Sequence, residues 1–521
     1  MISFSRTIQG RLRRSLVTAG GAALVSILAG TGAIAGDRDR TVIIAYSGQV
    51  NTIDPMRSDY GQTDLIDNIL YDTLVAYDGD NKVVGRLATA FKLADDVKSV
   101  DITLRPDVKF HDGSALTAKD VAYTLDRLKR LGSGIASQID GYEATTITDD
   151  THLTIKLSKP SSLFLGALSK VYIVNAALVS SKAGSDEGQA WLQAHDAGSG
   201  PFVIGPPQGQ AIVAKHFADY WEKADGRPDA FMFRRIDESA TKRDELLAGN
   251  IDLALFIGDH DVPALEADPK LKVVLLKSTE QTEIVFNTRK GPTADPRVRK
   301  AIRLAFDYKG ALASILSGHG ELANGPLPNS LGCRPDLPVV KQDLAAAKKI
   351  LDDAGIKDLH VVMKFQPAKE QSKQEAALLQ SNLREIGVTL DLEPIAFPNY
   401  LASLKNLDSI PQMMLLVDFA QFPDPGVVLV KGYKSDAIGT NRAGYANPEV
   451  DKLLDQALAS SDATKRCEIY KKVQEIVDGD SVMVDMYTLT APDVYRVASL
   501  RGLVASATVD PLAPIDLRLA P

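Results

Sequence analysis

Segments with helical periodicity and segments with strand periodicity alternate along most of the 521-residue chain. In one segment, Leu153, Ile155 and Leu157 alternate with polar residues, as in a half-buried strand. In another, residues 295–305 begin with an Asp-Pro pair, a strong helix start, and carry apolar residues on one face. This alternation favours open α/β sheets over an all-helical or an all-β fold. Because the chain is longer than one hydrophobic core usually organises, we expect two or three domains.

Residues 100–130 place strands, turns and a helix in one short module. Alternating apolar residues from Val100 to Leu104 indicate a strand that packs one face on a core. Thr117 and Asp120 have the spacing of a capping box at the start of a helix. Since none of these residues forms a catalytic or metal-binding pattern, we expect the module to serve packing and to contact no ligand.

The first 35 residues have the features of a secretory signal. Arginines precede an apolar run from Leu16 to Leu28, and Ala33–Ala35 has the small residues of a cleavage site, so we expect cleavage after Ala35. The run is short and rich in glycine and alanine, which argues against a retained membrane anchor. Arg13 and Arg14 partly resemble a twin-arginine signal, but the general secretion route fits better, and the export route stays open. With no cysteine near the cleavage point, we expect no lipid anchor there.

Composition and charge exclude several classes of partner. Hydrophobic residues make up 45% and charged residues 24% of the chain, which is typical of a globular protein. Because the first 35 residues carry four arginines and no acid, the remainder has a formal charge of −12 against −8 for the whole chain. Such an acidic chain is a poor partner for nucleic acid or an anionic membrane surface.

The sequence lacks the common patterns of enzymes and metal sites. It has no HExxH, no CxxC and no GxSxG. It also has no phosphate-binding loop, so we expect this chain not to hydrolyse ATP itself. Its seven histidines never have the spacing of helical metal ligands, and Asp259–Asp261 is the one dense cluster of potential ligands. We expect no catalytic residue, no metal and no cofactor. Cys333 and Cys467 either pair in an oxidising compartment or remain two thiols.

Several blocks of sequence are similar, in the same order, to those of a known family. They are "NTIDP" (51–55), "ILYDTLVAYD" (69–78), "LRPDVKFHDGSALTAKDVAYTLDR" (104–127), "GSGPFVI" (198–204), "DELLAGNIDLAL" (244–255) and "NPEVDKLLDQAL" (447–458). These blocks resemble the extracytoplasmic solute-binding proteins of family 5, the peptide, nickel and opine type, which are receptors of ABC importers. The resemblance covers essentially the whole chain after the signal.

The resemblance implies an α/β fold like that of the type II periplasmic binding proteins. It has two α/β lobes joined by a hinge, with an accessory lobe inserted in the first. We expect residues 1–35 to be the signal peptide and residues 81–194 to be accessory lobe II. Lobe I is expected to combine residues 36–80, 195–280 and 490–521, and lobe III to comprise residues 281–489.

Ligand contacts are expected from loops that face the cleft between the lobes. The strand Thr41–Tyr46 is followed by small and amide residues, and open α/β sheets bind ligands at the carboxyl ends of their strands. The loop after the buried strand near residue 254 is expected to contribute in the same way. The predicted contacts are Ser47, Gly48, Gln49, Asn51, Gly258, Asp259, Asn287, Asp418, Phe419, Gln421 and Asp424.

The segment Met413–Leu429 departs from the family pattern at an informative position. In the peptide-binding members the matching loop lines the cleft, and an aspartate four residues before its second proline pairs with the amino terminus of the peptide. Here that position is Gln421, and Asp418 stands where those members often carry tryptophan. An amide donates as well as accepts hydrogen bonds, so it suits a hydroxyl, an amide or a carboxylate better than an ammonium. Either the ligand lacks a free amino terminus, as in a sugar–amino acid opine, or Asp418, three residues earlier, supplies the negative charge that pairs with the amino terminus.

The resemblance therefore predicts a periplasmic receptor that captures a small peptide or peptide-like solute by hinge closure. It would deliver that solute to an inner-membrane ABC permease and its ATPase subunits, and we expect it to be a monomer. A receptor for nickel, a metal chelate or haem on the same fold is the alternative. A secreted hydrolase with an unrecognised acid pair is a more distant one.

Overall fold

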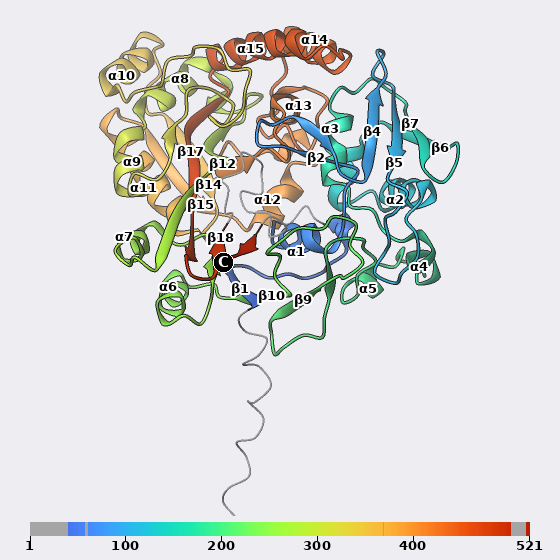
Figure 1. Cartoon of the computed structure of the whole chain (residues 1–521). Coiled ribbons are helices and arrows are strands. Elements are labelled where there is room, and N and C mark those ends of the chain that lie inside the picture. The colour runs from blue at the N-terminus through green and yellow to red at the C-terminus, as the bar shows by residue number, and fades with distance from the viewer. Residues whose placement is uncertain (1–39, 58–60, 368, 502–516, 521) are drawn as a thin grey trace, which may run out of the picture. The chain divides into compact units, whose positions relative to one another are not determined.

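The computed structural model describes residues 40–57, 61–367, 369–501 and 517–520 (Figure 1). The expected signal peptide and its cleavage point after Ala35 lie outside these residues. Among the described residues, no helix combines the length and hydrophobicity that a membrane crossing requires.

A large mixed sheet organises the described chain. Its strands follow the order β15 (Thr389–Pro394), β14 (His360–Phe365), β16 (Met413–Phe419), β12 (Leu271–Phe286), β17 (Met483–Arg496), β11 (Leu253–Ala254), β1 (Thr41–Tyr46), β10 (Ala230–Arg235), β9 (Ile212–His216) and β8 (Phe202–Ile204), with β13 (Glu321–Leu322) paired to β17. The expected strand at residues 41–46 is confirmed as β1.

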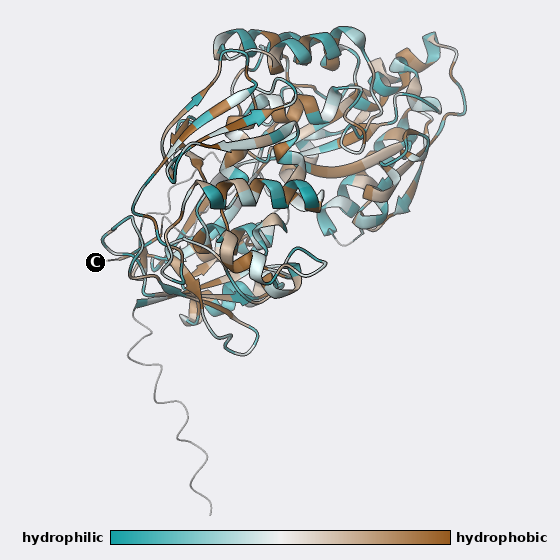
Figure 2. Ribbon diagram, turned by 90° about the vertical axis from the view of Figure 1, so that its right-hand side faces the viewer, coloured by the Kyte–Doolittle hydropathy of each residue, from teal (hydrophilic) through white to brown (hydrophobic). Residues whose placement is uncertain are grey.

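Helices surround the sheet, as expected from the alternating periodicity (Figure 1). They are α1 (Gly61–Leu70), α2 (Ala118–Leu131), α3 (Phe164–Ala167), α4 (Ala176–Ser181), α5 (Gln189–Leu192), α6 (Ser239–Ala248), α7 (Val262–Glu266), α8 (Pro296–Ala305), α9 (Tyr308–Ser314), α10 (Leu344–Asp353), α11 (Glu370–Glu385), α12 (Phe397–Ser403), α13 (Pro425–Tyr433), α14 (Pro448–Leu458) and α15 (Ala463–Gly479). Figure 2 shows hydrophilic and hydrophobic residues on the same helices, as expected of helices that meet water on one side and a core on the other.

Strand β16 is buried on both of its faces. Met413 and Leu415 point into a core with α8 to α11, whereas Met414 and Leu416 point into a second core with α12 to α15. Since successive side chains of a strand point to opposite faces, a continuous apolar run is what a strand between two helix layers requires. The sheet is therefore covered on both sides around β16.

The module at residues 100–130 forms part of a smaller antiparallel sheet and its helix. The sheet has the order β4 (Ala88–Leu93), β5 (Ser99–Leu104), β7 (His152–Leu157) and β6 (Tyr142–Ile147), and a two-stranded sheet, β2 (Val75–Tyr77) with β3 (Val83–Gly85), precedes it. The backbone N–H of Thr117 donates to the Asp120 carboxylate at 2.8 Å, which confirms the predicted cap of α2. Val100 and Leu125 are fully buried in one core with residues of β1 and α1.

Arg127 of α2 forms a buried ion pair with Asp54 of the loop after β1. The guanidinium donates to the two carboxylate oxygens at 3.0 and 2.8 Å, and both side chains are essentially unexposed. The Nε–H of Arg127 donates to the carbonyl oxygen of Glu187 at 2.8 Å. The pair therefore connects three segments that are distant in sequence.

Candidate functional site

Two edges of the large sheet face each other along β12 and β17. Strands β1, β10 and β11 are parallel, and β11 and β12 both pair antiparallel with β17, so all four run in the same direction. Strands β14, β15 and β16 run opposite to β12. The carboxyl ends of β1, β10 and β11, here called the first edge, therefore point toward the carboxyl ends of β14, β15 and β16, here called the second edge.

The register shows what lies between the two edges. Strand β11 ends at Ala254, which pairs with Val494 of β17, and Val494 in turn pairs with Val273 of β12. Strand β16 ends at Phe419, which pairs with Glu280 of the same strand β12. Only a few residues of β12 and β17 thus separate the two edges, and open α/β sheets bind ligands at such carboxyl ends.

At the first edge, Lys242 of α6 connects the end of β1 to the end of β11. Its Nζ donates to Ser47 Oγ at 2.6 Å and to the carbonyl oxygen of Leu255 at 2.7 Å. The side chain is only 1% exposed, and this burial lowers the pKa of Lys242 to about 8. The structure therefore brings Ser47 and the loop after β11 together, around a lysine that fixes both.

The other predicted residues of the first edge differ in what they contact. The backbone N–H of Gly48 donates to Asp237 Oδ1 at 2.8 Å, and that of Gly258 donates to Ser239 Oγ at 2.8 Å. Gln49 and Asn51 are exposed. The two glycines are therefore held in place by their backbones, whereas the two amide side chains face solvent.

Phe256 is the most unusual residue of this edge. Its φ is +53°, a left-handed conformation that is unfavourable for a non-glycine residue, and its side chain is 53% exposed. The backbone N–H of Phe256 donates to Asp493 Oδ1 at 2.9 Å. Because strained backbone conformations cluster at functional sites, the exposed ring of Phe256 is a candidate ligand contact.

The acidic cluster at Asp259–Asp261 is satisfied by protein groups. Asp259 Oδ1 lies 2.5 Å from His319 Nδ1, and burial raises the pKa of Asp259. Asp261 accepts hydrogen bonds from Ser239 Oγ and from Arg243 Nη1. Among the described residues, no group of histidine, cysteine and carboxylate side chains is arranged to hold a metal ion.

We expect the stability of the protein to fall as the pH rises from about 4 to about 7, in part because of Asp493. Burial raises the pKa of this carboxyl to about 7. The folded state therefore keeps a proton that the unfolded chain has already lost, which stabilises folding at low pH and is lost as the pH rises through 7. One such group contributes a slope of about 1.4 kcal/mol per pH unit. Urea unfolding at several pH values should show a flatter profile for Asp493→Asn, which keeps the acceptor for Phe256.

The control for this prediction is Asp237→Asn. Arg235 holds the pKa of the Asp237 carboxyl below its usual range, so this group contributes stability that is lost as the pH falls. Removing it should leave the decline between pH 4 and 7 in place. An Asp493→Asn profile as steep as that of the wild type would contradict the assignment.

At the second edge, Asp418 lies between two cationic side chains. Its Oδ1 accepts a hydrogen bond from Lys431 Nζ of α13 at 2.6 Å, and its Oδ2 lies 2.9 Å from Arg442 Nη1. Burial alone would raise the pKa of Asp418, but Arg442 and Lys431 outweigh burial and lower it. Phe419 is 36% exposed, with Lys431 Nζ 5.7 Å from the centre of its ring.

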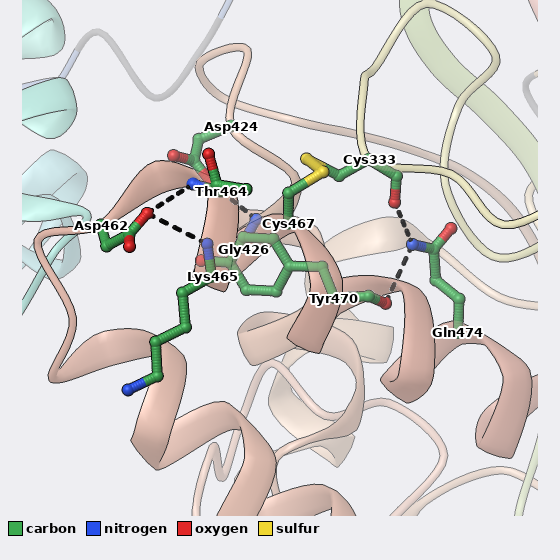
Figure 3. The surroundings of a disulfide bond; sticks show 9 residues. All are labelled: Cys333, Asp424, Gly426, Asp462, Thr464, Lys465, Cys467, Tyr470 and Gln474. Carbon is green, nitrogen blue, oxygen red and sulfur yellow. Dashed lines mark hydrogen bonds between the residues drawn. A yellow bond between two sulfur atoms is a disulfide. The ribbon is translucent and has the colours of Figure 1, made fainter.

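Asp424 and Gln421 occupy different positions in the loop after β16. Asp424 Oδ1 accepts the N–H of Gly426 at 2.7 Å and so caps α13, close to the disulfide that joins Cys333 to Cys467 (Figure 3). Burial raises the pKa of Asp424. Gln421 is half-buried. The structure therefore gives Asp424 a helix-capping role and resolves the pairing of the cysteines that the sequence left open.

Asn287 does not join the other predicted contacts. It follows the carboxyl end of β12, which runs opposite to β16 and therefore ends away from the second edge. Its Nδ2 donates to the carbonyl oxygen of Ile410 at 3.0 Å, and its Oδ1 accepts the N–H of Arg289 at 3.0 Å. The side chain is 1% exposed, so Asn287 is a buried turn residue, and a ligand contact there stays a prediction.

Several charged residues of the two edges were missed by sequence reasoning. They are Lys242, Lys431, Arg442 and Asp493. Lys431 offers the one usable signal, because a lysine in the apolar run "PGVVLVKGY" of α13 is unusual. The other three lie in ordinary surface-like sequence, and only the tertiary structure shows where they point.

A separate cavity of about 250 Å³ lies beside the module at residues 100–130 and β8. Within it, His111 contacts Asp196 Oδ1 at 2.5 Å through Nδ1 and the carbonyl oxygen of Gly200 at 3.0 Å through Nε2. The cavity is lined by Phe110, His111, Asp112, Asn175, Leu178, Trp191, His195, Asp196, Ala197, Gly198, Val203 and Ile204. None of the predicted ligand contacts is among these residues.

Solved structures define the fold class. A periplasmic binding protein DppA of Helicobacter pylori, in complex with the peptide STSA, superposes with a TM-score of 0.80, covering 93% of this chain and 99% of that one at 22% identity. NikA of Brucella suis, in complex with Fe(III)-EDTA, gives a TM-score of 0.81 at 21% identity, with 92% and 100% coverage. The fold is that of the type II periplasmic binding proteins, as the sequence predicted.

The family follows from sequence similarity. A model of the bacterial extracellular solute-binding proteins, family 5, matches residues 82–439. The probable D,D-dipeptide-binding periplasmic protein DdpA of Escherichia coli is 30% identical, covering 86% of this chain and 88% of its own length. The glutathione-binding protein GsiB of Pectobacterium atrosepticum is 26% identical, and the match again covers 86% of this chain and 88% of that protein. The chain belongs to family 5 of the bacterial extracellular solute-binding proteins.

Proposed function

We propose that the protein is the periplasmic receptor of an ABC importer and that it captures a small peptide or peptide-like solute between the first and second edges. The observation that carries the proposal is the meeting of two sets of carboxyl-end loops along β12 and β17, in a chain of a solute-binding family. The two relatives named above are a D,D-dipeptide-binding and a glutathione-binding protein, which favours a peptide-like solute.

The hinge is proposed to lie in β12 and β17, where they pass from one edge to the other. Their pairing is irregular between Lys277 and Gln281 and again between Thr282 and Glu283. Such irregularities bend a strand and interrupt its ladder of hydrogen bonds. The expected boundaries of lobes I and III, 280/281 and 489/490, fall in these strands, so closure by bending there remains part of the proposal.

Residues of proposed lobes II and III contact each other directly. Ser162 donates through its N–H to the carbonyl oxygen of Leu458 at 2.8 Å and through its Oγ to that of Ala457 at 3.0 Å. The ring of Tyr77, in proposed lobe I, stacks with that of Phe422 in lobe III, with their centres 6.2 Å apart. The hydrogen bonds thus join the end of α14 to proposed lobe II, and the stacked rings join the loop after β16 to proposed lobe I.

Export and delivery complete the proposal. A leader ending at Ala35 would carry the chain to the periplasm, and an inner-membrane permease with its own ATPase subunits would receive the solute from a monomeric receptor. The related solved structures include complexes with nickel bound to L-histidine and with agropinic acid, so a chelate or an opine is the second candidate solute.

A thermal-shift screen tests the function. Di- and tripeptides, glutathione, sugar–amino acid conjugates, nickel chelates and haem are each added to the purified protein. We expect a peptide-like solute to raise the melting temperature, because a ligand at 100 times its Kd stabilises the folded state by about 2.7 kcal/mol. Calorimetry should give one solute per chain, and the solute should be recovered unchanged.

Variants of the two exposed aromatic residues locate the binding. Phe256→Ala and Phe419→Ala should each weaken binding about tenfold, equivalent to about 1.4 kcal/mol. Leu247→Ala is the matched control. This apolar residue is also exposed, at 45%, but it lies near the carboxyl end of α6, beyond the turn that contains Lys242. A response only to haem or to a nickel chelate would replace the proposed solute class, and turnover of the solute would replace the receptor by an enzyme.

A further inference from the structure

The carboxylate of Asp418 already pairs with two cationic side chains of the protein. Its Oδ1 accepts hydrogen bonds from Lys431 Nζ at 2.6 Å, from the N–H of Phe419 at 2.9 Å and from Arg442 Nη2 at 3.2 Å. Its Oδ2 lies 2.9 Å from Arg442 Nη1. Asp418 therefore serves as the counter-ion of two protein cations.

Hydrogen-bond donors exceed acceptors around this carboxylate. A lysine ammonium has three N–H groups, and Lys431 uses one of them on Asp418. Arg442 Nη1 and the hydroxyl group of Tyr400 on α12 make no hydrogen bond within the described residues. The side chain of Lys431 is 22% exposed.

The charge of the cluster is also unbalanced toward the positive side. Lys431 and Arg442 carry two positive charges against the one of Asp418. Glu283 is the other acid nearby, and burial, followed by the charge of Asp418, raises its pKa. The raised pKa favours the uncharged form of Glu283, so this acid offsets the two cations less than Asp418 does, although burial also lowers the pKa of Lys431.

We propose that Lys431 and Arg442 bind an acidic group of the solute, so that the end of the solute held at the second edge is an anion and not a free amino terminus. This inference rests on the proposed receptor function and narrows its substrate class to amino-acid conjugates with a carboxylate at that end. Gln421 fits the same solute, because its amide N–H group donates to a carboxylate. Arg442 is suited to the role, since a guanidinium matches the two oxygens of a carboxylate.

A matched series of alanine compounds tests the inference by calorimetry. Ala-Ala has an ammonium at the variable end, N-acetyl-Ala-Ala has a neutral amide, and N-succinyl-Ala-Ala has a carboxylate. We expect the succinyl compound to bind at least about tenfold more tightly than Ala-Ala. Tighter binding of Ala-Ala would overturn the inference and leave the receptor function intact. Absence of binding by these compounds and by the whole screening panel would overturn both.

Substitutions distinguish two roles for Asp418: counter-ion of Lys431 and Arg442, or direct partner of a ligand ammonium. Lys431→Gln and Arg442→Gln should each remove the preference for the succinyl compound, and Lys431→Arg should restore it. Asp418→Asn should strengthen binding of the succinyl compound, whereas weaker binding of Ala-Ala to this variant would show that Asp418 meets an ammonium. Lys434→Gln is the control, because Lys434 pairs with Asp436 and Asp455 outside the cluster. Loss of the preference in this control as well would overturn the assignment, and thermal unfolding confirms that each variant is folded.

Discussion

Arg127→Leu should lower the free energy of unfolding by about 3–5 kcal/mol, because it leaves a buried carboxylate without its cation. Arg127 is fully buried and Asp54 is 1% exposed, and the guanidinium donates to both carboxylate oxygens. The substitution keeps apolar bulk at this position, so the loss reports the unpaired charge of Asp54 together with the lost hydrogen bond to the carbonyl oxygen of Glu187. Urea unfolding followed by circular dichroism measures it.

Two further variants identify the origin of this loss. Arg130→Gln breaks the partly exposed pair with Glu187, one turn further along α2, and should change stability by less than about 1 kcal/mol. Combining Arg127→Leu with Asp54→Asn removes the stranded charge and should recover part of the loss. If the double variant is as unstable as Arg127→Leu, the destabilisation comes from packing and not from the ion pair.

The sequence predicted the local structure on either side of this ion pair but not the pair itself. The cap at Thr117 and the buried strand at Val100 follow from spacing over a few residues. Asp54 and Arg127 are 73 residues apart, and each lies in a segment that local rules describe completely without the other. Such a contact depends on how the accessory sheet packs against the loop after β1, which no periodicity in the chain encodes.

The candidate site shows the same division. The rule that ligands lie at the carboxyl ends of strands predicted the loop after β1, and the family resemblance predicted the loop after β16. The structure places the two loops at facing edges. Asn287 lies away from the second edge because β12 runs opposite to β16, a property of the topology that the sequence does not show. Lys431 and Arg442 were missed because their role depends on Asp418, a neighbour in space and not in sequence.

Removing the disulfide between Cys333 and Cys467 should lower the free energy of unfolding by about 3–5 kcal/mol. The two cysteines are 134 residues apart, and a cross-link over such a long loop greatly restricts the unfolded chain. Gln474 of α15 donates to the carbonyl oxygen of Cys333 at 2.7 Å, a contact that the double serine variant retains (Figure 3). Urea unfolding of Cys333→Ser/Cys467→Ser against the oxidised wild type measures the difference.

Reduction provides the internal control for this prediction, because it breaks the same bond without changing the sequence. A reducing agent should bring the unfolding midpoint of the wild type close to that of the double variant and should leave the variant unchanged. Disulfides persist in the oxidising bacterial periplasm. The relative DdpA is described as a periplasmic protein, so we expect the bond to persist there. Since the cross-link acts mainly on the unfolded chain, its removal should change stability much more than solute affinity. A double variant within about 1 kcal/mol of the oxidised wild type would show that the loop between the cysteines is already restricted in the unfolded state.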